Sequence, residues 1–277
     1  MISKKDPLVS ILINNYNKEM FCIKSVKSAI NQEYKKVEVI FYDDCSSDHS
    51  VNKIEKYKKK FKIKKLKIIK NKIRQNVFSY NQIEGIKKSS FKSKGKIICL
   101  LDSDDFFKKD KVKKIVAQFK KNKSFEILFD RPIYYHNKKN YKKINKSYKI
   151  RNNKWPSFPP TSCISFRRKS LVNAIKKINI KKNKEIWFDF RVATYFAIKK
   201  KQFHLINDHL TFYRQDSLGY DKKFIKYFNM EWWKRRNQAF DFLKFLDKYS
   251  YIKNAYSIDF LATKFINKIY NIFHIYI

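Results

Sequence analysis

Carboxylates follow directly after two apolar, strand-like runs of this chain, and this arrangement restricts the fold more than any other feature of the sequence. Val37 to Tyr42 leads into the turn Asp43 to Asp48, and Lys96 to Leu101 leads into Asp102 to Asp105. Open α/β sheets bind their ligands at the carboxyl ends of their strands. The two runs therefore predict an α/β fold with a polar ligand site at one edge of its sheet.

The first hundred residues alternate strand-like runs with helical patterns, which is typical of βαβ units on a mostly parallel sheet. The predicted strands are Leu8 to Ile13, Val37 to Tyr42, Leu66 to Ile69 and Lys96 to Leu101, and the predicted helices are Phe21 to Ile30, about Ser50 to Lys60, and Tyr80 to Ser90. Later segments are a helix at Val112 to Phe119, a strand at Phe125 to Phe129, a loop or hairpin at Ile133 to Arg151, Thr161 to Phe166 with a helix from about Lys169, a helix at Ile186 to Ile198, and an extended segment at Leu205 to Tyr213. After Gly219 the pattern is helical. A chain of 277 residues suits one such domain with a C-terminal appendage.

The chain is strongly basic, with 65 Lys and Arg against 24 Asp and Glu and a formal net charge of +41. Dense positive charge neutralises phosphates, so nucleic-acid binding is one class of function to weigh. The abundance of Lys, Asn, Ile, Phe and Tyr beside 3 Gly and 5 Pro also fits the bias of an AT-rich genome that places Lys on solvated faces. Either way, the surface should attract anionic membranes and phosphate-bearing substrates.

The cysteine pattern and the hydropathy favour a cytoplasmic protein. Cys22, Cys45, Cys99 and Cys163 form no C-x-x-C pair and no ligand spacing with histidine, so reduced thiols are expected. Met1 to Pro7 is short and polar, and nowhere do 18 uninterrupted apolar residues occur. The sequence predicts neither a leader peptide nor a membrane span.

Three carboxylates at one strand end, Asp102, Asp104 and Asp105, repel one another unless a cation or hydrogen-bond donors meet them. A hard divalent ion shared with a diphosphate would do so, because Mg²⁺ and Mn²⁺ take few carboxylates plus substrate oxygens. An acidic first turn, stabilised by the dipole of a following helix, explains the same residues. The run alone does not decide between these two interpretations.

Four elements in a fixed order carry a family resemblance. They read V-S-I-L-I-N-N-Y-N from Val9, E-V-I-F-Y-D-D-C-S-S-D from Glu38, N-Q-I-E-G-I from Asn81 and L-L-D-S-D-D from Leu100. Together they resemble the family 2 inverting glycosyltransferases of GT-A fold, of the bacterial surface-polysaccharide type. The likeness is specific over about residues 8 to 110 and traceable to about 218. It implies a GT-A domain over 1–218, with a donor-nucleotide half at 1–105 and an acceptor half at 106–218, and leaves 219–277 as a basic amphipathic helical tail.

The resemblance also implies how the donor nucleotide is held. Asn15, Tyr16 and Asp43 would contact its base, Tyr16 by stacking and Asp43 by accepting a hydrogen bond from a ring N–H. Without the family, Asp43 is explained as a capped strand end and Tyr16 as a core aromatic residue. Both interpretations stay open on the sequence.

The same resemblance assigns the carboxylate run and a catalytic base. Asp102 would lie near the ribose or the metal, and Asp104 and Asp105 would hold Mg²⁺ or Mn²⁺ on the diphosphate. The acceptor hydroxyl needs a base, and Asp189 occupies the matching place in an apolar, aromatic segment that should raise its pKa. An ordinary acidic residue in the first turn of a helix is the alternative for Asp189.

Several positions depart from the family pattern. Asn14 stands where relatives often have Pro, Phe188 where they often have Glu, and Asn76 to Ser79 where Gly is usual. Phe212 to Gln215 resembles a late Y-R-x-H element with Gln in place of His, which makes Arg214 a candidate diphosphate contact. These departures bear on the pose of the donor more than on the reaction.

The tail carries one apolar helical stripe at positions 258, 261, 262, 265, 269, 272, 273 and 276, with Lys264, Asn267, Lys268 and Asn271 off it. Such a helix either packs on the catalytic domain or lies in a membrane interface, where a lipid-linked acceptor would be met. Lys222, Lys223, Lys234, Arg235 and Arg236 would strengthen the second interpretation. His274 is expected to be an ordinary helix-face residue.

The sequence thus predicts a metal-dependent inverting glycosyltransferase that takes a nucleotide-diphosphate donor, a UDP-sugar by family frequency, and a glycan or lipid-linked acceptor. Two rivals remain: a catalytically silent relative that serves in docking or assembly, and a basic nucleic-acid-binding protein. The rival that binds nucleic acid gives no reason for the two acidic strand ends. Acceptor choice is expected to depend on residues 130–185, the least recognisable part of the chain.

Overall fold

The computed structural model describes residues 6–135, 141–148, 150, 155–178, 181–215, 229–247 and 257–275. Its strands are β1 (Val9–Asn15), β2 (Val37–Asp43), β3 (Leu66–Lys70), β4 (Ile97–Asp102), β5 (Phe106–Phe107), β6 (Ile127–Tyr135), β7 (Tyr141–Lys143), β8 (Ile164–Arg167) and β9 (Leu205–Arg214). Its helices are α1 (Cys22–Ile30), α2 (Ser50–Lys60), α3 (Phe78–Lys92), α4 (Lys111–Lys121), the 3₁₀ turn η1 (Thr161–Cys163), α5 (Arg168–Lys177), α6 (Phe188–Lys199), α7 (Met230–Leu246) and α9 (Ile258–Ile275). The predicted α/β fold is confirmed.

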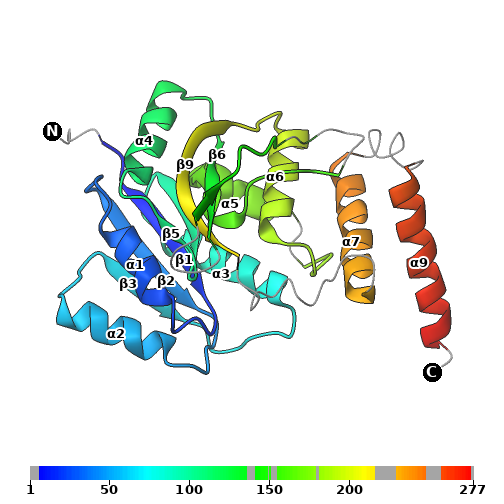
Figure 1. Ribbon diagram of the computed structural model, residues 1–277, viewed down its shortest axis with the longest axis horizontal. Helices are drawn as coiled ribbons and strands as arrows, with labels where there is room; N and C mark the ends of the chain where they lie inside the picture. Colours follow the sequence, from blue (N-terminus) through cyan, green and yellow to red (C-terminus); the bar gives the residue numbers. More distant parts are fainter. Residues whose placement is uncertain are drawn as a thin grey trace.

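One mixed sheet runs through the molecule in the order β3-β2-β1-β4-β8-β6-β9-β5, with β7 paired to β6 (Figure 1). The four strands of the first half are parallel, whereas β8 is antiparallel to both β4 and β6. The register sets Asn15 opposite Asp43 and Asn14 opposite Asp102. The two acidic strand ends therefore flank the carboxyl end of β1, as the sequence predicted.

Helices cover both faces of the sheet. On one face α1, α2 and α4 bury side chains such as Val26, Ile54 and Ile115 against β1, β2 and β4. On the other face α3, α5, α6 and α7 pack against the alternate side chains of the same strands, with Leu12 and Leu100 at their centre. Because both faces are covered, the strands read as continuous apolar runs rather than as alternating patterns.

The second half of the sheet contains a strand that is longer than its sequence pattern. β6 continues to Tyr135 through the fully buried Asp130, and it pairs with β7 to form the hairpin that was one of two options for Ile133 to Arg151. Asp130 is tolerated there because Lys111 of α4, also fully buried, places its Nζ 2.8 Å from Asp130 Oδ2. The Lys111 ammonium also donates to Ser162 O and Thr211 Oγ1.

The C-terminal helices α7 and α9 lie side by side at one end of the molecule (Figure 1). α7 shares the core of α6 through Ala239, Phe242 and Leu246. α9 contacts α7 mainly through polar side chains, while five members of its apolar stripe, Ile258, Leu261, Phe265, Ile269 and Ile272, are exposed. Two of the residues expected to strengthen a membrane contact do not face outward: Arg235 is buried against Trp187, and Arg236 is paired with Asp259. Lys222 and Lys223 lie outside the described residues, as does the side chain of His274. None of the helices that the structure describes is long and apolar enough to cross a bilayer.

Candidate active site

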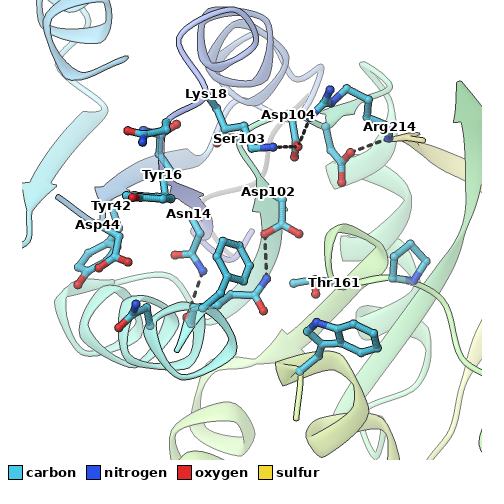
Figure 2. Close-up of a pocket in the computed structure, with 18 of the residues that line it drawn as sticks. Asn14, Tyr16, Lys18, Tyr42, Asp44, Asp102, Ser103, Asp104, Thr161 and Arg214 are labelled. Atoms are coloured by element: carbon cyan, nitrogen blue, oxygen red, sulfur yellow. Dashed lines mark hydrogen bonds and ion pairs between the residues drawn. The ribbon is translucent and has the colours of Figure 1, made fainter. Parts of the chain in front are cut away.

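A cavity of about 860 Å³ opens at the carboxyl ends of β1, β2 and β4 (Figure 2). Its far wall comes from the start of α6 and the end of β9, so segments more than a hundred residues apart meet there. The predicted site residues that line it are Asn15, Tyr16, Asp102, Asp104, Asp105, Asp189 and Arg214. Asp43 is the predicted site residue that is missing from the described lining.

Asp104 carries the clearest negative charge in the cavity. Lys18 Nζ and Arg214 Nη2 lie 2.7 and 2.8 Å from its Oδ2, and Figure 2 shows the two cations on either side of it. Burial raises the pKa of the Asp104 carboxyl, but the charges of Lys18 and Arg214 outweigh burial and bring the pKa below its usual value. Asp104 is therefore ionised, and its charge is neutralised from within the protein.

Asp105 is turned away from this pair of cations. Its Oδ2 accepts a hydrogen bond from Ser162 Oγ at 2.6 Å, and its Oδ1 accepts one from the backbone N–H of Arg214 at 2.8 Å. Burial first, and then the charges of Asp104 and Asp102, raise the pKa of Asp105 well above its usual value. This carboxyl fixes the end of β9, which carries Arg214, against the end of β4.

Asp102 stands between the cavity floor and α3. Its Oδ1 accepts a hydrogen bond from Gln82 Nε2 at 3.2 Å, and its backbone N–H donates to Ser162 Oγ. Burial and the neighbouring Asp104 charge raise the pKa of Asp102 to about 7. A carboxyl in this state gains from any cation or hydroxyl group that a ligand brings near it.

Of the two carboxyls at the end of β2, Asp43 does not line the cavity, although the sequence suggested that it contacts the ligand. Asp43 turns inward: Oδ1 accepts from Asn15 Nδ2 at 2.7 Å and from Ser46 Oγ at 2.6 Å, and Oδ2 accepts from Ser46 N. Asp44 lines the cavity instead, and Arg74 Nε lies 3.0 Å from its Oδ2. Neighbouring side chains at the end of a strand point to opposite sides, which is why Asp43 and Asp44 face different ways.

Tyr16 is one of the aromatic side chains of the cavity wall. The guanidinium of Arg74 lies 3.6 Å from the centre of its ring, a stacked cation–π contact that joins Tyr16 to Asp44. Buried polar atoms nearby have no hydrogen-bond partner among the described residues: Asn14 Oδ1, Asn15 Oδ1 and the Tyr42 hydroxyl. Such atoms are costly unless paired. The side chains of Asn14, Asn15 and Asn17, together with Tyr16, make this end of the cavity polar and aromatic.

Asp189 lies in the first turn of α6 and faces the cavity from the side opposite β2. Its Oδ1 accepts the backbone N–H of Phe190 at 2.7 Å, which fixes the carboxylate at the helix start. Trp187 precedes it in the lining, and Arg235 of α7 stacks on the Trp187 ring at 3.9 Å. α7 thus supports the wall that carries the candidate base.

Gly85 explains one motif of the sequence in steric terms. A Cβ at this position would lie 2.8 Å from the Tyr42 ring and 3.0 Å from Asn14 Oδ1. Only glycine lets α3 approach β1 and β2 so closely, and that approach brings Gln82 to Asp102. The glycine of N-Q-I-E-G-I therefore shapes the cavity without touching its ligand.

Four residues that organise the site were not predicted from the sequence: Lys18, Asp44, Arg74 and Ser162. Lys18 and Asp44 closely follow β1 and β2, whose ends already held predicted site residues, so their position in the sequence could have indicated them. Arg74 belongs to a basic stretch with no pattern, and Ser162 lies in the 3₁₀ turn before β8. For these two no sequence signal existed, because only the sheet order brings them to the cavity.

The fold and cavity together define an α/β protein that binds a ligand at the carboxyl ends of parallel strands, with cations for negative charge and a polar, aromatic end for a ring. The sequence profile of glycosyl transferase family 2 matches residues 10–228. The chain belongs to that family.

Two curated relatives match about two fifths of the chain. An uncharacterized glycosyltransferase of Haemophilus influenzae is 33% identical over 116 residues, which are 42% of this chain and 34% of the relative. The putative teichuronic acid biosynthesis glycosyltransferase TuaG of Bacillus subtilis is 30% identical over 110 residues, 39% of this chain and 40% of the relative. The chain therefore matches about a third to two fifths of the length of these proteins.

Solved structures extend the likeness of fold to nearly the whole chain. TarS of Staphylococcus aureus superposes with a TM-score of 0.61 at 16% identity, covering 93% of this chain and 72% of TarS; its complex with UDP-GlcNAc gives 0.59 at 14% over the same shares. The mannosyltransferase PcManGT of Pyrobaculum calidifontis, in complex with GDP-Man and Mn²⁺, gives 0.54 at 11%, covering 94% and 74%. These likenesses establish the GT-A fold.

The carboxylates of the cavity could hold a divalent metal ion only with help from a ligand. Among the described residues no three His, Cys, Asp or Glu side chains converge as a ready-made cluster. Asp104 nevertheless offers an ionised carboxylate at the cavity, and Mg²⁺ commonly uses one or two carboxylates plus phosphate oxygens and water. The residues fit a metal that arrives with a diphosphate better than one held by the protein alone.

Proposed function

We propose that this protein is an inverting glycosyltransferase that moves a sugar from a nucleotide-diphosphate donor, a UDP-sugar in our assignment, to a hydroxyl of a glycan or lipid-linked glycan. The observation that carries the proposal is the cavity itself. It joins a cation pair on Asp104, a polar and aromatic end at Tyr16, and Asp189 on the opposite wall. Such a transfer needs separate groups for the diphosphate, for the nucleotide base and for the acceptor hydroxyl.

The donor base would lie at the Tyr16 end. Tyr16 offers a ring face, Asn15 offers a buried amide held by Asp43, and Asp44 with Arg74 lines the rim. In this assignment Asp43 acts by fixing Asn15, and Asp44 is the carboxylate that meets the ligand. The 1–105 segment remains our donor half, and 106–218 our acceptor half.

The diphosphate would lie between Tyr16 and Asp189, next to Asp102 and Asp104. Lys18 and Arg214, which neutralise Asp104 in the free protein, would move to the phosphate oxygens when the donor binds. Asp104 would hold Mg²⁺ or Mn²⁺. Asp105 would keep its hydrogen bond to the backbone N–H of Arg214, which fixes the end of β9 while the guanidinium moves, rather than bind the metal directly. Such an ion stabilises the negative charge of a departing diphosphate.

Asp189 would act as the general base. As the acceptor oxygen attacks the anomeric carbon from the face opposite the diphosphate, its proton passes to the Asp189 carboxylate and the bond from sugar to diphosphate breaks. A base of this kind contributes about 10²- to 10⁴-fold to the rate. The start of α6 and the stacked Trp187 hold that carboxylate on the acceptor side of the cavity.

The relatives support a role in making bacterial surface polysaccharide. TuaG is described as acting in teichuronic acid biosynthesis and TarS as a poly(ribitol-phosphate) β-N-acetylglucosaminyltransferase. We propose a cell-envelope glycan as the acceptor and the cytoplasm, next to the inner face of the membrane, as the location. Free thiols at all four cysteines agree with a reducing compartment.

Calorimetry with UDP, GDP and dTDP, each with and without Mn²⁺, tests the donor site. We expect one nucleotide to bind in a metal-dependent manner, to lose binding in Asp104→Ala, and to keep it in the matched surface variant Asp208→Ala. Asp189→Asn should bind the nucleotide and lose turnover. If none of the three nucleotides binds to a protein that circular dichroism shows to be folded, the donor assignment is wrong.

A further inference from the structure

Helix α9 is packed with its polar side inward. Toward α7, Thr263 is fully buried and Asn267 is 9% exposed, and Asn267 Nδ2 donates to Trp233 O at 3.1 Å. Two ion pairs, Arg236 with Asp259 and Lys264 with Asp241, tie the helices together at the edges of this contact. Phe260 adds one aromatic contact, edge-on to Phe240.

The apolar stripe of α9 points away from this contact. Its exposed members are Ile258 (86%), Leu261 (52%), Phe265 (65%), Ile269 (37%) and Ile272 (48%). They recur at intervals of three and four residues, so they form one continuous face along the helix. We call these five residues the α9 stripe. An amphipathic helix normally buries such a face, and its exposure marks an interaction surface.

The charge of the protein indicates which kind of partner covers the α9 stripe. A formal net charge of +41 opposes the approach of a second copy and favours an anionic surface. On α9 itself Asp259 is paired with Arg236, whereas Lys268 beside the stripe is exposed. A bilayer with anionic lipids suits both features of this surface. Its negative head groups attract Lys268 and the positively charged protein, and its acyl chains accept the α9 stripe.

The length and composition of the helix fix how it would lie. Eighteen residues span about 27 Å, and α9 is not apolar enough to cross a bilayer. A helix with an apolar face containing Phe and Leu and a polar face containing Lys lies in the plane of the interface. At the outer end of the molecule, α9 is free to do so without disturbing the sheet (Figure 1).

From these observations we infer that α9 docks the protein onto an anionic lipid surface, with the α9 stripe inserted at the boundary between head groups and acyl chains. α7 then connects the membrane to the wall of the cavity, because Arg235 of α7 stacks on Trp187 next to Asp189. The surface would hold the cavity near lipid-linked acceptors. Docking requires no turnover, so this inference and the proposed transferase activity can fail separately.

Vesicle co-sedimentation of the full chain tests the inference. We expect binding to vesicles of phosphatidylcholine with about one third phosphatidylglycerol, and much weaker binding to phosphatidylcholine alone. Leu261→Asp with Phe265→Asp should lower the partition coefficient about tenfold or more. Lys268→Glu should lower it several-fold on the anionic vesicles only.

The matched control is Phe61→Asp with Phe91→Asp. It makes the same change of charge at two exposed phenylalanines outside α9, which are 56% and 48% exposed, and it should bind vesicles as the wild type does. Equal loss in both double variants would overturn the inference, because general positive charge would then explain binding. A dimer that the stripe variant abolishes in sedimentation velocity, without vesicle binding by the wild type, would assign the stripe to self-association instead.

Discussion

The sheet and the C-terminal helix pair treat apolar and polar residues in opposite ways. The sheet buries its apolar residues on both faces and gathers charge at one edge, around Asp102, Asp104 and Arg214. The pair α7 and α9 places polar contacts inside and leaves the α9 stripe outside. An apolar face with a regular period is buried when another element of the same chain covers it. When such a face is exposed, as on α9, it indicates a binding partner outside the chain.

Two identical substitutions give the largest expected contrast. Leu100→Ala in β4 removes a side chain that is 1% exposed and should lower the free energy of unfolding by about 2–5 kcal/mol. Leu261→Ala in α9 removes one that is 52% exposed and should change it by less than about 0.5 kcal/mol. Urea unfolding of both variants measures the difference. A cost above about 1.5 kcal/mol for Leu261→Ala would mean that the stripe packs within the folded chain.

The contrast between the sheet and α9 also explains which parts of the structure could be predicted from the sequence. The Ser and Asp residues of the turn after β2, which are good N-caps, predicted α2 at its observed bounds, and the apolar runs of β2 and β4 predicted that Asp43 and Asp102 lie at strand ends. The period carried no information on whether Asp43 or Asp44 faces the cavity, since that depends on the hydrogen bonds of Asp43 to Asn15 and Ser46 and of Asp44 to Arg74. For α9 the period correctly predicted the helix, but whether the stripe was covered depended on a partner that no period encodes.

β6 shows a second reason for failure. Asp130 interrupts its apolar pattern, so the sequence predicted a strand that ends at Phe129. The strand continues because Lys111, 19 positions earlier, neutralises Asp130, while Thr211 Oγ1 donates to its Oδ1. Long-range partners of buried polar residues must be known before their local pattern can be interpreted.

At the charged edge of the sheet, Lys18→Met should change metal binding about tenfold, or 1.4 kcal/mol. In the free protein Lys18 forms an ion pair with Asp104. Removing the lysine charge should therefore tighten the binding of Mn²⁺ in the absence of nucleotide. With nucleotide present, the loss of a phosphate contact should weaken binding instead. Calorimetry gives both values, and Lys53→Met, an exposed lysine of α2, is the control. Unchanged Mn²⁺ affinity would show that Lys18 does not compete for Asp104.

In the helix pair, Asn267→Ala should release α9 at a cost of about 1 kcal/mol, because Trp233 O loses its side-chain donor. Hydrogen exchange should speed up at the amides of α9 and stay unchanged in β4, since the sheet does not depend on this contact. Asn271→Ala, on an exposed position of the same helix, is the control. Faster exchange in β4 as well would show that α9 belongs to the same cooperative unit as the sheet.

The smallest expected effect lies at the amino-terminal edge of the sheet, far from the cavity. Burial raises the pKa of Glu38, but hydrogen bonds from Lys67, Ser10 Oγ and the backbone N–H of Lys94 outweigh it, and the pKa falls below its model-compound value of 4.5. A carboxyl with a lowered folded-state pKa stabilises the protein above pH 4.5, and this stabilisation is lost as the pH falls through the folded-state pKa.

Glu38→Gln should therefore lower the melting temperature at pH 7 and leave it less changed at pH 3, which flattens the acid side of the stability profile. Glu55→Gln, at an exposed carboxylate of α2 paired with Lys70, should leave that profile as it is in the wild type. Scanning calorimetry of the three proteins from pH 3 to pH 7 measures the slopes. Parallel profiles for wild type and Glu38→Gln would mean that Glu38 is not ionised against its donors, and that charge in this sheet is organised only at the edge with the cavity.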